Sequence, residues 1–460
     1  MRGRSLLVAL VLAATGAVRA ELPDGALPDG ATVLDPDVMW DTRNPGSMAI
    51  SPDRSSVAYV SKGALWKCNI TKGPPTKLAD LPNTATDLLA MPEYRFARSN
   101  IELIREQIGY EEYQRKIATT EVQILGLTWT REQDGVVYGL RQRYQNSRET
   151  AVQRVMLAST SGEVTTLATI ERQPWSRPQT FSAFHLTPDR KYVIAYTGTH
   201  PMIWDLATGR PRVTPFDYLL PSASSNRFLA IEIDSRQLVI VDEDFEVAER
   251  FEVTAPEGRE CRLLWSHDEK FALCRFKHQY AETKWDGVRV DLTTGTKQPL
   301  EGNYFADTFW FTGRGGELAQ SGIVGIRYEA VDRMVGGGLA IIPDGESKRR
   351  TLVKFSFDPD DPRLPRMPNR PEYPLPVADS RFERFAMALP VNVRPGFMFH
   401  WVDRKGQTEV FPEGKSDAYI APFHVLGFVD GDRRILGRTE SQLFSVPIER
   451  LLTTEEAQDE

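Results

Sequence analysis

The hydrophobic positions of this chain fall in short runs, and clusters of turn residues separate one run from the next. A clear example begins at Ser51-Pro52-Asp53 and continues through the apolar run 56–60. A second short apolar segment that ends in tryptophan, 64–66, follows, and the unit closes at Gly73. Proline presets the backbone for a tight turn, and Ser or Asp side chains hydrogen-bond back to it. Runs of β-branched, aromatic and small apolar residues between such turns are typical of strands. The pattern therefore predicts an all-β fold made of short antiparallel strands.

The same unit recurs along the chain, with clear copies at 187–209 and 266–295. Weaker copies begin near Thr130, Ser224, Thr312, Ala378 and Asp430. A sheet of four short strands does not bury both of its faces alone, so such copies stack around an axis. Eight copies predict an eight-bladed β-propeller over residues 21–450, with seven blades as the alternative if one copy is misread.

The last copy lacks an outer strand. Pro447 follows its final apolar run, and an acidic tail occupies 451–460. The segment 31–34 near the other end of the chain has no unit of its own. We expect this N-terminal strand to pair into the last blade, because a closed ring leaves no exposed sheet edge at the junction.

The first of two predicted insertions is helical and runs from 84 to 120. Ser99 or Asn100 is a suitable helix cap, and Ile101, Ile104 and Ile108 then fall on one helical face. We interpret the segment as a helical hairpin packed on the edge of the ring. The alternative is a lid or a partner-docking element, since loops on a rigid scaffold often carry function.

The second predicted insertion, 358–376, is rich in proline. Its prolines recur at every third residue from Pro359 to Pro374. Polyproline II has three residues per turn, so the prolines would line one side of an extended rod. Such a rod serves either as a stiff surface crossover or as a ligand for an aromatic-lined groove.

The first twenty residues have the features of a secretory signal peptide. Arg2 and Arg4 precede a short apolar run, and Ala20 fits the cleavage position. We therefore expect a periplasmic or secreted protein, with a retained N-terminal anchor as the alternative. Removal of 1–20 takes away three arginines and changes the net charge from −7 to −10. The acidic mature chain argues against a nucleic-acid partner, and no later run is long enough for a transmembrane segment.

The chain has three cysteines, Cys68, Cys261 and Cys274. Cys261 and Cys274 lie on strands predicted to be neighbours, so both a disulfide and a pair of buried thiols are compatible with the sequence. No paired Cys/His spacing is present, so we expect no metal site and no cofactor.

The clear copies resemble the propeller repeats of the TolB-like and dipeptidyl-peptidase-IV N-terminal-like proteins, a WD-repeat-like class. The third copy departs from this pattern because it has His267 in place of proline and lacks the short apolar segment that ends in tryptophan. In the peptidase branch the propeller precedes an α/β-hydrolase domain, but no G-x-S-x-G motif occurs here. In the TolB branch the propeller is a periplasmic interaction platform with an extra N-terminal domain, for which residues 21–45 are too short. The resemblance thus implies a propeller alone, with insertions.

Propeller sites usually lie at the central channel or at one of its mouths. The candidate ligand-binding residues on the innermost strands are Trp129, His185, Trp265, Trp310 and His424. The competing interpretation is packing between blades, where large aromatic residues are normally found. The histidines lack metal-ligand spacing, and no nucleophile elbow, phosphate loop or calcium loop is present, so we predict no catalytic residue.

These observations favour an exported, non-enzymatic and monomeric platform for another envelope or extracellular protein. A hydrolase or lyase acting on glycans or peptides in the channel is the first alternative, and a small-molecule sensor is the second. Titratable groups with shifted pKa values gathered at one mouth would favour the enzyme.

Overall fold

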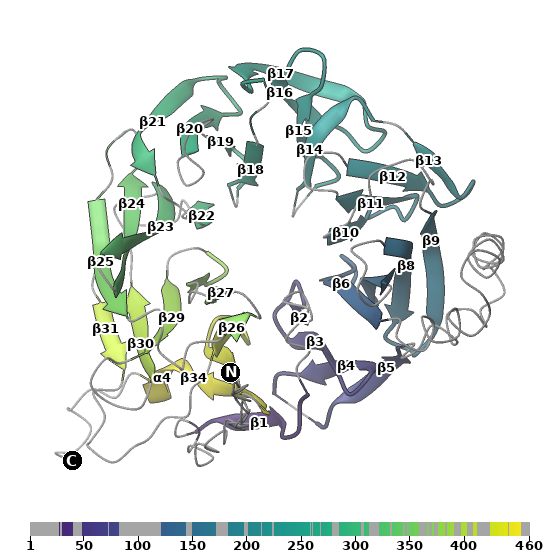
Figure 1. The fold of residues 1–460 in the computed structure, drawn as a ribbon, viewed down its shortest axis with the longest axis vertical. Helices are drawn as coiled ribbons and strands as arrows, with labels where there is room; N and C mark the ends of the chain where they lie inside the picture. The colour runs from purple at the N-terminus through teal and green to yellow at the C-terminus, as the bar shows by residue number, and fades with distance from the viewer. Residues whose placement is uncertain are drawn as a thin grey trace, which may run out of the picture.

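A computed structural model describes most of the repeat region. The described ranges are 30–39, 48–81, 121–143, 150–171, 183–196, 201–257, 259–277, 285–304, 308–311, 322–331, 334–343, 350–357, 376–390, 397–402, 408–411 and 424–451, without 72, 213, 223–224, 258, 260, 267, 382–383 and 440, together with 27, 346, 348, 366–367 and 370–371. Within them the strands form eight four-stranded sheets and one short hairpin. The predicted all-β propeller is confirmed: the sheets follow one another around a ring (Figure 1).

The first four sheets contain the following strands. Sheet 1 comprises β2 (Met48–Ile50), β3 (Ser56–Ser61), β4 (Ala64–Asn69) and β5 (Thr76–Asp80). Sheet 2 comprises β6 (Glu121–Trp129), β7 (Gly135–Arg143), β8 (Thr150–Ser159) and β9 (Val164–Glu171). Sheet 3 comprises β10 (Ala183–Leu186), β11 (Tyr192–Tyr196), β12 (Pro201–Asp205) and β13 (Arg210–Arg212). Sheet 4 comprises β14 (Phe216–Pro221), β15 (Phe228–Glu232), β16 (Gln237–Val241) and β17 (Val247–Thr254).

The remaining four sheets complete the ring. Sheet 5 comprises β18 (Cys261–Trp265), β19 (Phe271–Lys277), β20 (Trp285–Asp291) and β21 (Lys297–Tyr304). Sheet 6 comprises β22 (Thr308–Phe311), β23 (Gly322–Val331), β24 (Met334–Pro343) and β25 (Arg350–Phe357). Sheet 7 comprises β28 (Val377–Ala378), β29 (Phe385–Pro390), β30 (Phe397–Val402) and β31 (Thr408–Phe411). Sheet 8 comprises β32 (His424–Val429), β33 (Arg434–Arg438), β34 (Leu443–Pro447) and β1 (Thr32–Asp35).

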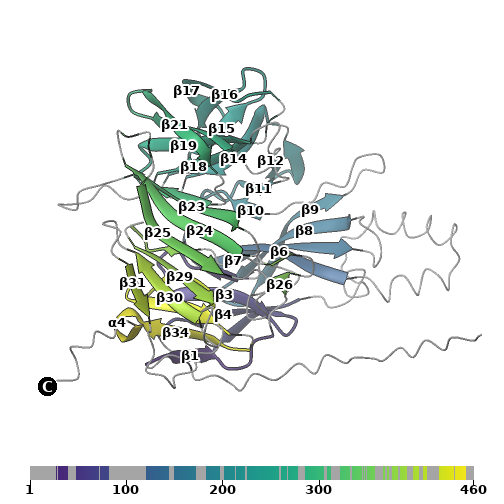
Figure 2. The same ribbon diagram turned by 60° about the vertical axis from the view of Figure 1, so that its left-hand side comes forward.

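Sheets 1 to 7 are built in chain order from the centre of the ring outward. The first strand lies toward the centre and the fourth lies on the outside, as β2 and β5 show in sheet 1 (Figure 1). Each strand pairs antiparallel with the next, so short turns suffice to connect them. Sheets 2 and 6 have the longest strands and lie on opposite sides of the ring (Figures 1 and 2).

The predicted closure by an N-terminal strand is confirmed in sheet 8. β1 pairs antiparallel with β34, with Thr32 opposite Ser445 and Val33 opposite Phe444. The chain then continues onto sheet 1, where Asp35 accepts a hydrogen bond of 2.5 Å from the Tyr59 hydroxyl. The N-terminal segment therefore completes the last sheet and also ties that sheet to the first one.

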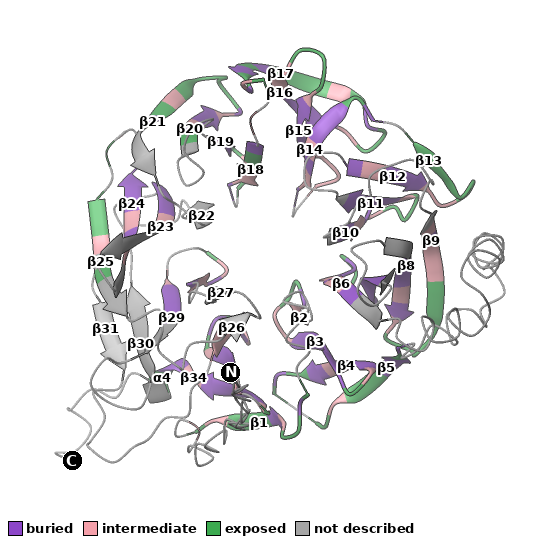
Figure 3. Ribbon diagram, in the orientation of Figure 1, coloured by how far each residue is buried: buried purple, intermediate pink, exposed green. Residues whose placement is uncertain are grey.

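The hydrophobic core lies between neighbouring sheets, and the second and third strands of the sheets are the most buried (Figure 3). All six residues of β3 are buried. Val57 and Tyr59 pack toward sheet 8, whereas Ala58 and Val60 pack toward sheet 2. A strand covered on both faces has a continuous apolar run rather than strict alternation, which explains the runs in the sequence.

The three cysteines are buried, and no disulfide joins them. Cys261 and Cys274 lie on the paired strands β18 and β19 without a disulfide, and they belong to the apolar cluster between sheets 4 and 5. The buried-thiol alternative is therefore confirmed. Burial raises the pKa of Cys68 to about 11 and that of Cys274 to about 12, so these thiols stay protonated at neutral pH.

The predicted signal peptide 1–20 and the predicted helical insertion 84–120 lie outside the described residues, as does the acidic tail after the short helix α4 (Ile448–Leu451). In the proline-rich segment 358–376, the strands β26 (Arg366–Met367) and β27 (Arg370–Pro371) pair antiparallel. The prediction of one straight polyproline rod is therefore wrong across these residues, because the chain reverses direction there. No helix among the described residues is long and apolar enough to cross a membrane.

Candidate functional site at the rim of the ring

The turns between the first and second strands of the sheets form a repeated structure, which we call the rim. In sheet 1 the Ser51 backbone N–H donates to the Ser56 carbonyl, and Ser51 Oγ accepts from the Ser56 N–H, each at 2.9 Å. Ser51 Oγ also donates to Asp53 Oδ1 at 2.6 Å. Thr187 with Asp189 and Ser266 with Asp268 repeat this arrangement. The Ser/Thr-x-Asp motif of the sequence is therefore the part that closes each turn.

The fourth residue of these turns adopts the left-handed backbone conformation. The φ angles are 60° at Arg54, 61° at Gln133, 58° at Arg190 and 54° at Glu269. Glycine adopts this conformation without a steric penalty, whereas other residues lose about 1 kcal/mol or more. None of the four positions is glycine, so the side chain at this position compensates for the backbone cost.

Each of these four side chains contacts the turn of the preceding sheet. Arg54 Nη1 lies 2.7 Å from Asp432 Oδ1 in sheet 8, and Arg190 Nη2 lies 2.5 Å from Asp134 Oδ2 in sheet 2. The Gln133 amide, with its nitrogen toward Asp53 in sheet 1, donates to the two carboxylate oxygens at 2.7 and 3.1 Å. These contacts tie adjacent turns around the mouth of the ring, and we call them the rim network.

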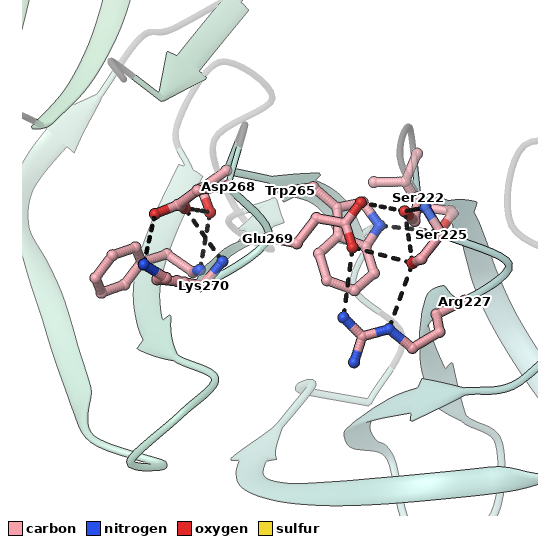
Figure 4. A network of polar contacts seen from close by, with 10 residues as sticks. Ser222, Ser225, Arg227, Trp265, Asp268, Glu269 and Lys270 are labelled. Carbon is pink, nitrogen blue, oxygen red and sulfur yellow. Dashed lines mark hydrogen bonds and ion pairs between the residues drawn. The ribbon is translucent and has the colours of Figure 1, made fainter. Parts of the chain in front are cut away.

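In the contact between sheets 4 and 5 the roles of donor and acceptor are exchanged. Glu269 accepts hydrogen bonds from the preceding sheet, whereas the other three side chains donate to it (Figure 4). Its carboxylate accepts a hydrogen bond from Ser222 Oγ and lies 3.0 Å from Ser225 Oγ. Arg227 Nη2 is 3.4 Å away. The Glu269 side chain is only 8% exposed, whereas that of Arg227 is 41% exposed. The serine hydroxyls, rather than the arginine, therefore provide most of the stabilisation of this carboxylate.

Asp432 of sheet 8 links this sheet to both of its neighbours in the ring, sheets 1 and 7. It pairs with Arg54 of sheet 1, and it accepts from the Ser380 backbone N–H of sheet 7 at 3.1 and 3.2 Å. Arg384 adds a bond of 3.3 Å to the Asp432 carbonyl. Because one carboxylate connects three sheets beside the closing strand, the closure of the ring is supported at the rim as well as by β1.

Three rim carboxylates, Asp53, Asp134 and Asp189, are held in their ionised form. The hydrogen bond from Arg190 lowers the pKa of Asp134. Burial opposes ionisation of Asp53 and Asp189, but hydrogen bonds from Ser51 and Thr187 hold their pKa values below the usual range. Such groups are acceptors at neutral pH rather than proton donors. Among the described residues, no group of three or more His, Cys, Asp or Glu side chains is placed to hold a metal ion.

Trp129 and Trp265 join the innermost strands of neighbouring sheets. Trp129 Nε1 donates to the Ala49 carbonyl on β2 at 2.9 Å, and Trp265 Nε1 donates to the Leu220 carbonyl on β14 at 3.2 Å. Each indole therefore contacts the sheet that precedes its own in the ring. These contacts are those of the packing interpretation, because Trp129 is buried, Trp265 is half-buried and each N–H finds a partner.

His185 and His424 are half-buried. Burial lowers the pKa of both to about 4, and the nearby Arg438 contributes for His424. His185 packs edge to face against Phe228, with ring centroids 6.4 Å apart. Trp310 is opposite Val324 in the β22–β23 register, and its side chain lies outside the described part. The five candidates are distributed over five sheets, and the described side chains are not brought together into one pocket.

Sequence reasoning did not find the left-handed residue of each turn. A signal was present, because the third position after Ser51, Thr130, Thr187 and Ser266 always carries a long polar side chain. Aligning the copies on the Ser/Thr marker shows this position, but its partner in the preceding sheet follows only from how the sheets stack.

The sequence matches no family model and no curated protein. The fold is similar to solved propellers. The C-terminal WD40 domain of Sif2 has a TM-score of 0.48 at 10% identity, and the match covers 92% of this chain and all of that domain. An oligogalacturonate lyase in complex with manganese has a TM-score of 0.37 at 12% identity, covering 71% of this chain and 90% of the lyase. The propeller domain of the Trilobed protease from Pyrococcus furiosus has a TM-score of 0.36 at 14% identity, covering 70% and 92%.

Proposed function

We propose that this protein is an exported, non-enzymatic platform that binds another envelope or extracellular protein through its rim. The observation that carries the proposal is the rim network, which fixes adjacent turns relative to one another while charged side chains of both signs remain exposed. The exposed charged residues of the rim include Arg131, Glu132, Asp189, Lys191, Asp268, Lys270 and Arg433. A surface of this kind suits the polar periphery of a protein–protein interface.

A fixed surface favours binding because little conformational freedom is lost on association. The turns of sheets 2 and 4 also contact each other past sheet 3, through Arg131 Nη1 and Asn226 Oδ1 at 3.1 Å. Turns from several sheets therefore form one continuous surface at the mouth. Export to the periplasm or the exterior follows from the signal features of residues 1–20 and remains part of the proposal.

The test is a crosslinking pull-down with tagged mature protein against the native envelope or extracellular fraction, read by mass spectrometry. Lys191→Glu and Lys270→Glu reverse charge at equivalent rim positions whose side chains are 61% and 57% exposed. Lys77→Glu on the outer strand β5 is the matched control, with an exposure of 48%. A partner captured by the wild type and the control, and lost with both rim variants, supports the proposal.

Deletion of 84–120 or of 358–376 tests whether an insertion, rather than the rim, makes the contact with the partner. A partner lost only with a deletion would move the contact to that insertion and overturn the rim assignment. Absence of any reproducible partner, combined with turnover of a glycan or peptide by the purified protein, would favour the alternative of a hydrolase or lyase.

A further inference from the structure

A cavity of about 350 Å³ lies between sheets 3 and 4, beside the connection that joins them. Its volume falls in the range of small-molecule sites. The lining side chains used below are Arg212, Thr214, Phe216, Glu232, Phe245 and Arg250. They come from β13, from the connection to β14, and from β14 to β17, so the cavity is separate from the rim turns that precede β11 and β15.

Arg212 is a cation whose hydrogen-bonding capacity is unused in the described part of the chain. Its nearest carboxylate oxygen, Glu246 Oε1, is 3.9 Å from Nη2, which is beyond hydrogen-bond distance. The Glu246 side chain is 77% exposed, so water competes for it. The guanidinium carbon of Arg212 lies 5.5 Å from the Phe245 ring centroid. The aromatic ring therefore helps to position a planar group that donates no hydrogen bond to a described residue.

The second arginine of the cavity is already paired. Arg250 Nη2 and Nε lie 2.9 and 3.4 Å from the two carboxylate oxygens of Glu232. Hydrogen bonds from Arg250 and Ser235 lower the pKa of Glu232, so this carboxylate is ionised and neutralises Arg250. Arg212 is therefore the positive charge of the cavity that remains available to a ligand.

Thr214 and two phenylalanines complete the site. Thr214 Oγ1 accepts from the Phe216 N–H at 3.0 Å, which leaves the hydroxyl proton for another acceptor. Phe216 and Phe245 are buried and provide an apolar wall. A fork of cationic donors, a hydroxyl donor and an apolar wall together match a carboxylate attached to a small apolar group.

We infer that this cavity binds such a carboxylate, with Arg212 as the bidentate donor. The carboxylate belongs either to a free small organic acid or to the C-terminus of a peptide that ends in an apolar residue. The inference does not depend on the rim proposal, because it uses none of the rim residues.

Isothermal titration calorimetry at low salt tests the inference on the full-length mature protein. The probes are benzoate, a short peptide ending in phenylalanine with a free C-terminus, and the same peptide as a C-terminal amide. We expect Arg212→Gln to weaken binding of the carboxylate probes roughly tenfold to hundredfold, since it removes charge-assisted hydrogen bonds. Arg210→Gln is the control, because Arg210 is exposed on the same strand and does not line the cavity.

Glu246→Gln provides a second measurement, in which the expected result is stronger rather than weaker binding of the probes. It removes the carboxylate nearest to Arg212, so binding of the probes should strengthen severalfold. Binding of benzoate identifies a small-acid site, and binding of the free peptide but not of benzoate or the amide identifies a C-terminus site. Absence of binding by both carboxylate probes at millimolar concentration, or equal binding by wild type and Arg212→Gln, overturns the inference.

Discussion

Replacing Glu269 with alanine tests whether the rim network stabilises the ring. The substitution removes a carboxylate acceptor that is only 8% exposed and leaves the hydroxyls of Ser222 and Ser225 without it. A hydrogen bond to a charged group contributes about 1.5–3 kcal/mol, and the half-exposed Arg227 at 3.4 Å adds little. Allowing for partial solvation of the serines, we expect the free energy of unfolding to fall by about 3 kcal/mol.

Two further substitutions at this position separate the contributions of the side chain and of the backbone conformation to the free energy of unfolding. Glu269→Gly loses the same contacts but relieves the left-handed conformation, with φ at 54°, so it should be about 1 kcal/mol more stable than Glu269→Ala. Glu269→Gln keeps one acceptor oxygen and should fall between alanine and wild type.

The assay is equilibrium unfolding in urea, followed by tryptophan fluorescence and by circular dichroism. Glu249→Ala, at an exposed position of the outer strand β17, is the control and should stay within about 0.5 kcal/mol of wild type. The reasoning is refuted if Glu269→Ala behaves like this control, or if the glycine variant is less stable than the alanine variant.

Three further predictions concern buried groups of the ring. Trp129→Phe should lower the free energy of unfolding by about 1 kcal/mol or more through loss of the bond to the Ala49 carbonyl, measured by urea unfolding. The pKa of His185 is lowered to about 4, so stability is complete above pH 6.5 and declines as the pH falls toward 4; His185→Leu should flatten this decline in acid unfolding curves. Cys68 should resist alkylation by iodoacetamide at pH 8 in the folded protein and react in urea, because it is buried with its pKa raised to about 11.

The turn chemistry of the sequence was sufficient to predict the fold. Ser51, Thr187 and Ser266 stand at the predicted turns, and the runs after them form the second strands of sheets 1, 3 and 5. This succeeds because the motif and the turn it closes are local. The ring closure by β1 was predictable for a different reason, since an incomplete last unit needs one more strand.

The site could not be predicted in the same way. An indole before a turn suits either a ligand or a packing role, and the carbonyl that Trp265 contacts is on another strand, 45 residues away in sequence. The cavity beside Arg212 depends on how β13 lies against β17, which involves two sheets with separate patterns. Local patterns thus specify the strands and turns, whereas the relations between sheets decide which side chains meet.

The pairing of β1 with β34 has a consequence for the order of assembly. Thr32 and Ser445 are 413 residues apart, so the first strand made waits for almost the whole chain before its partner exists. The other sheets have partners close in sequence and can form as they are synthesised. Until β34 is available, β1 has no partner strand and the ring is open, with the apolar faces of its first and last sheets uncovered, a state prone to aggregation. A chain truncated before Leu443 would remain in that state, so loss of the last 18 residues would affect solubility far more than their number suggests.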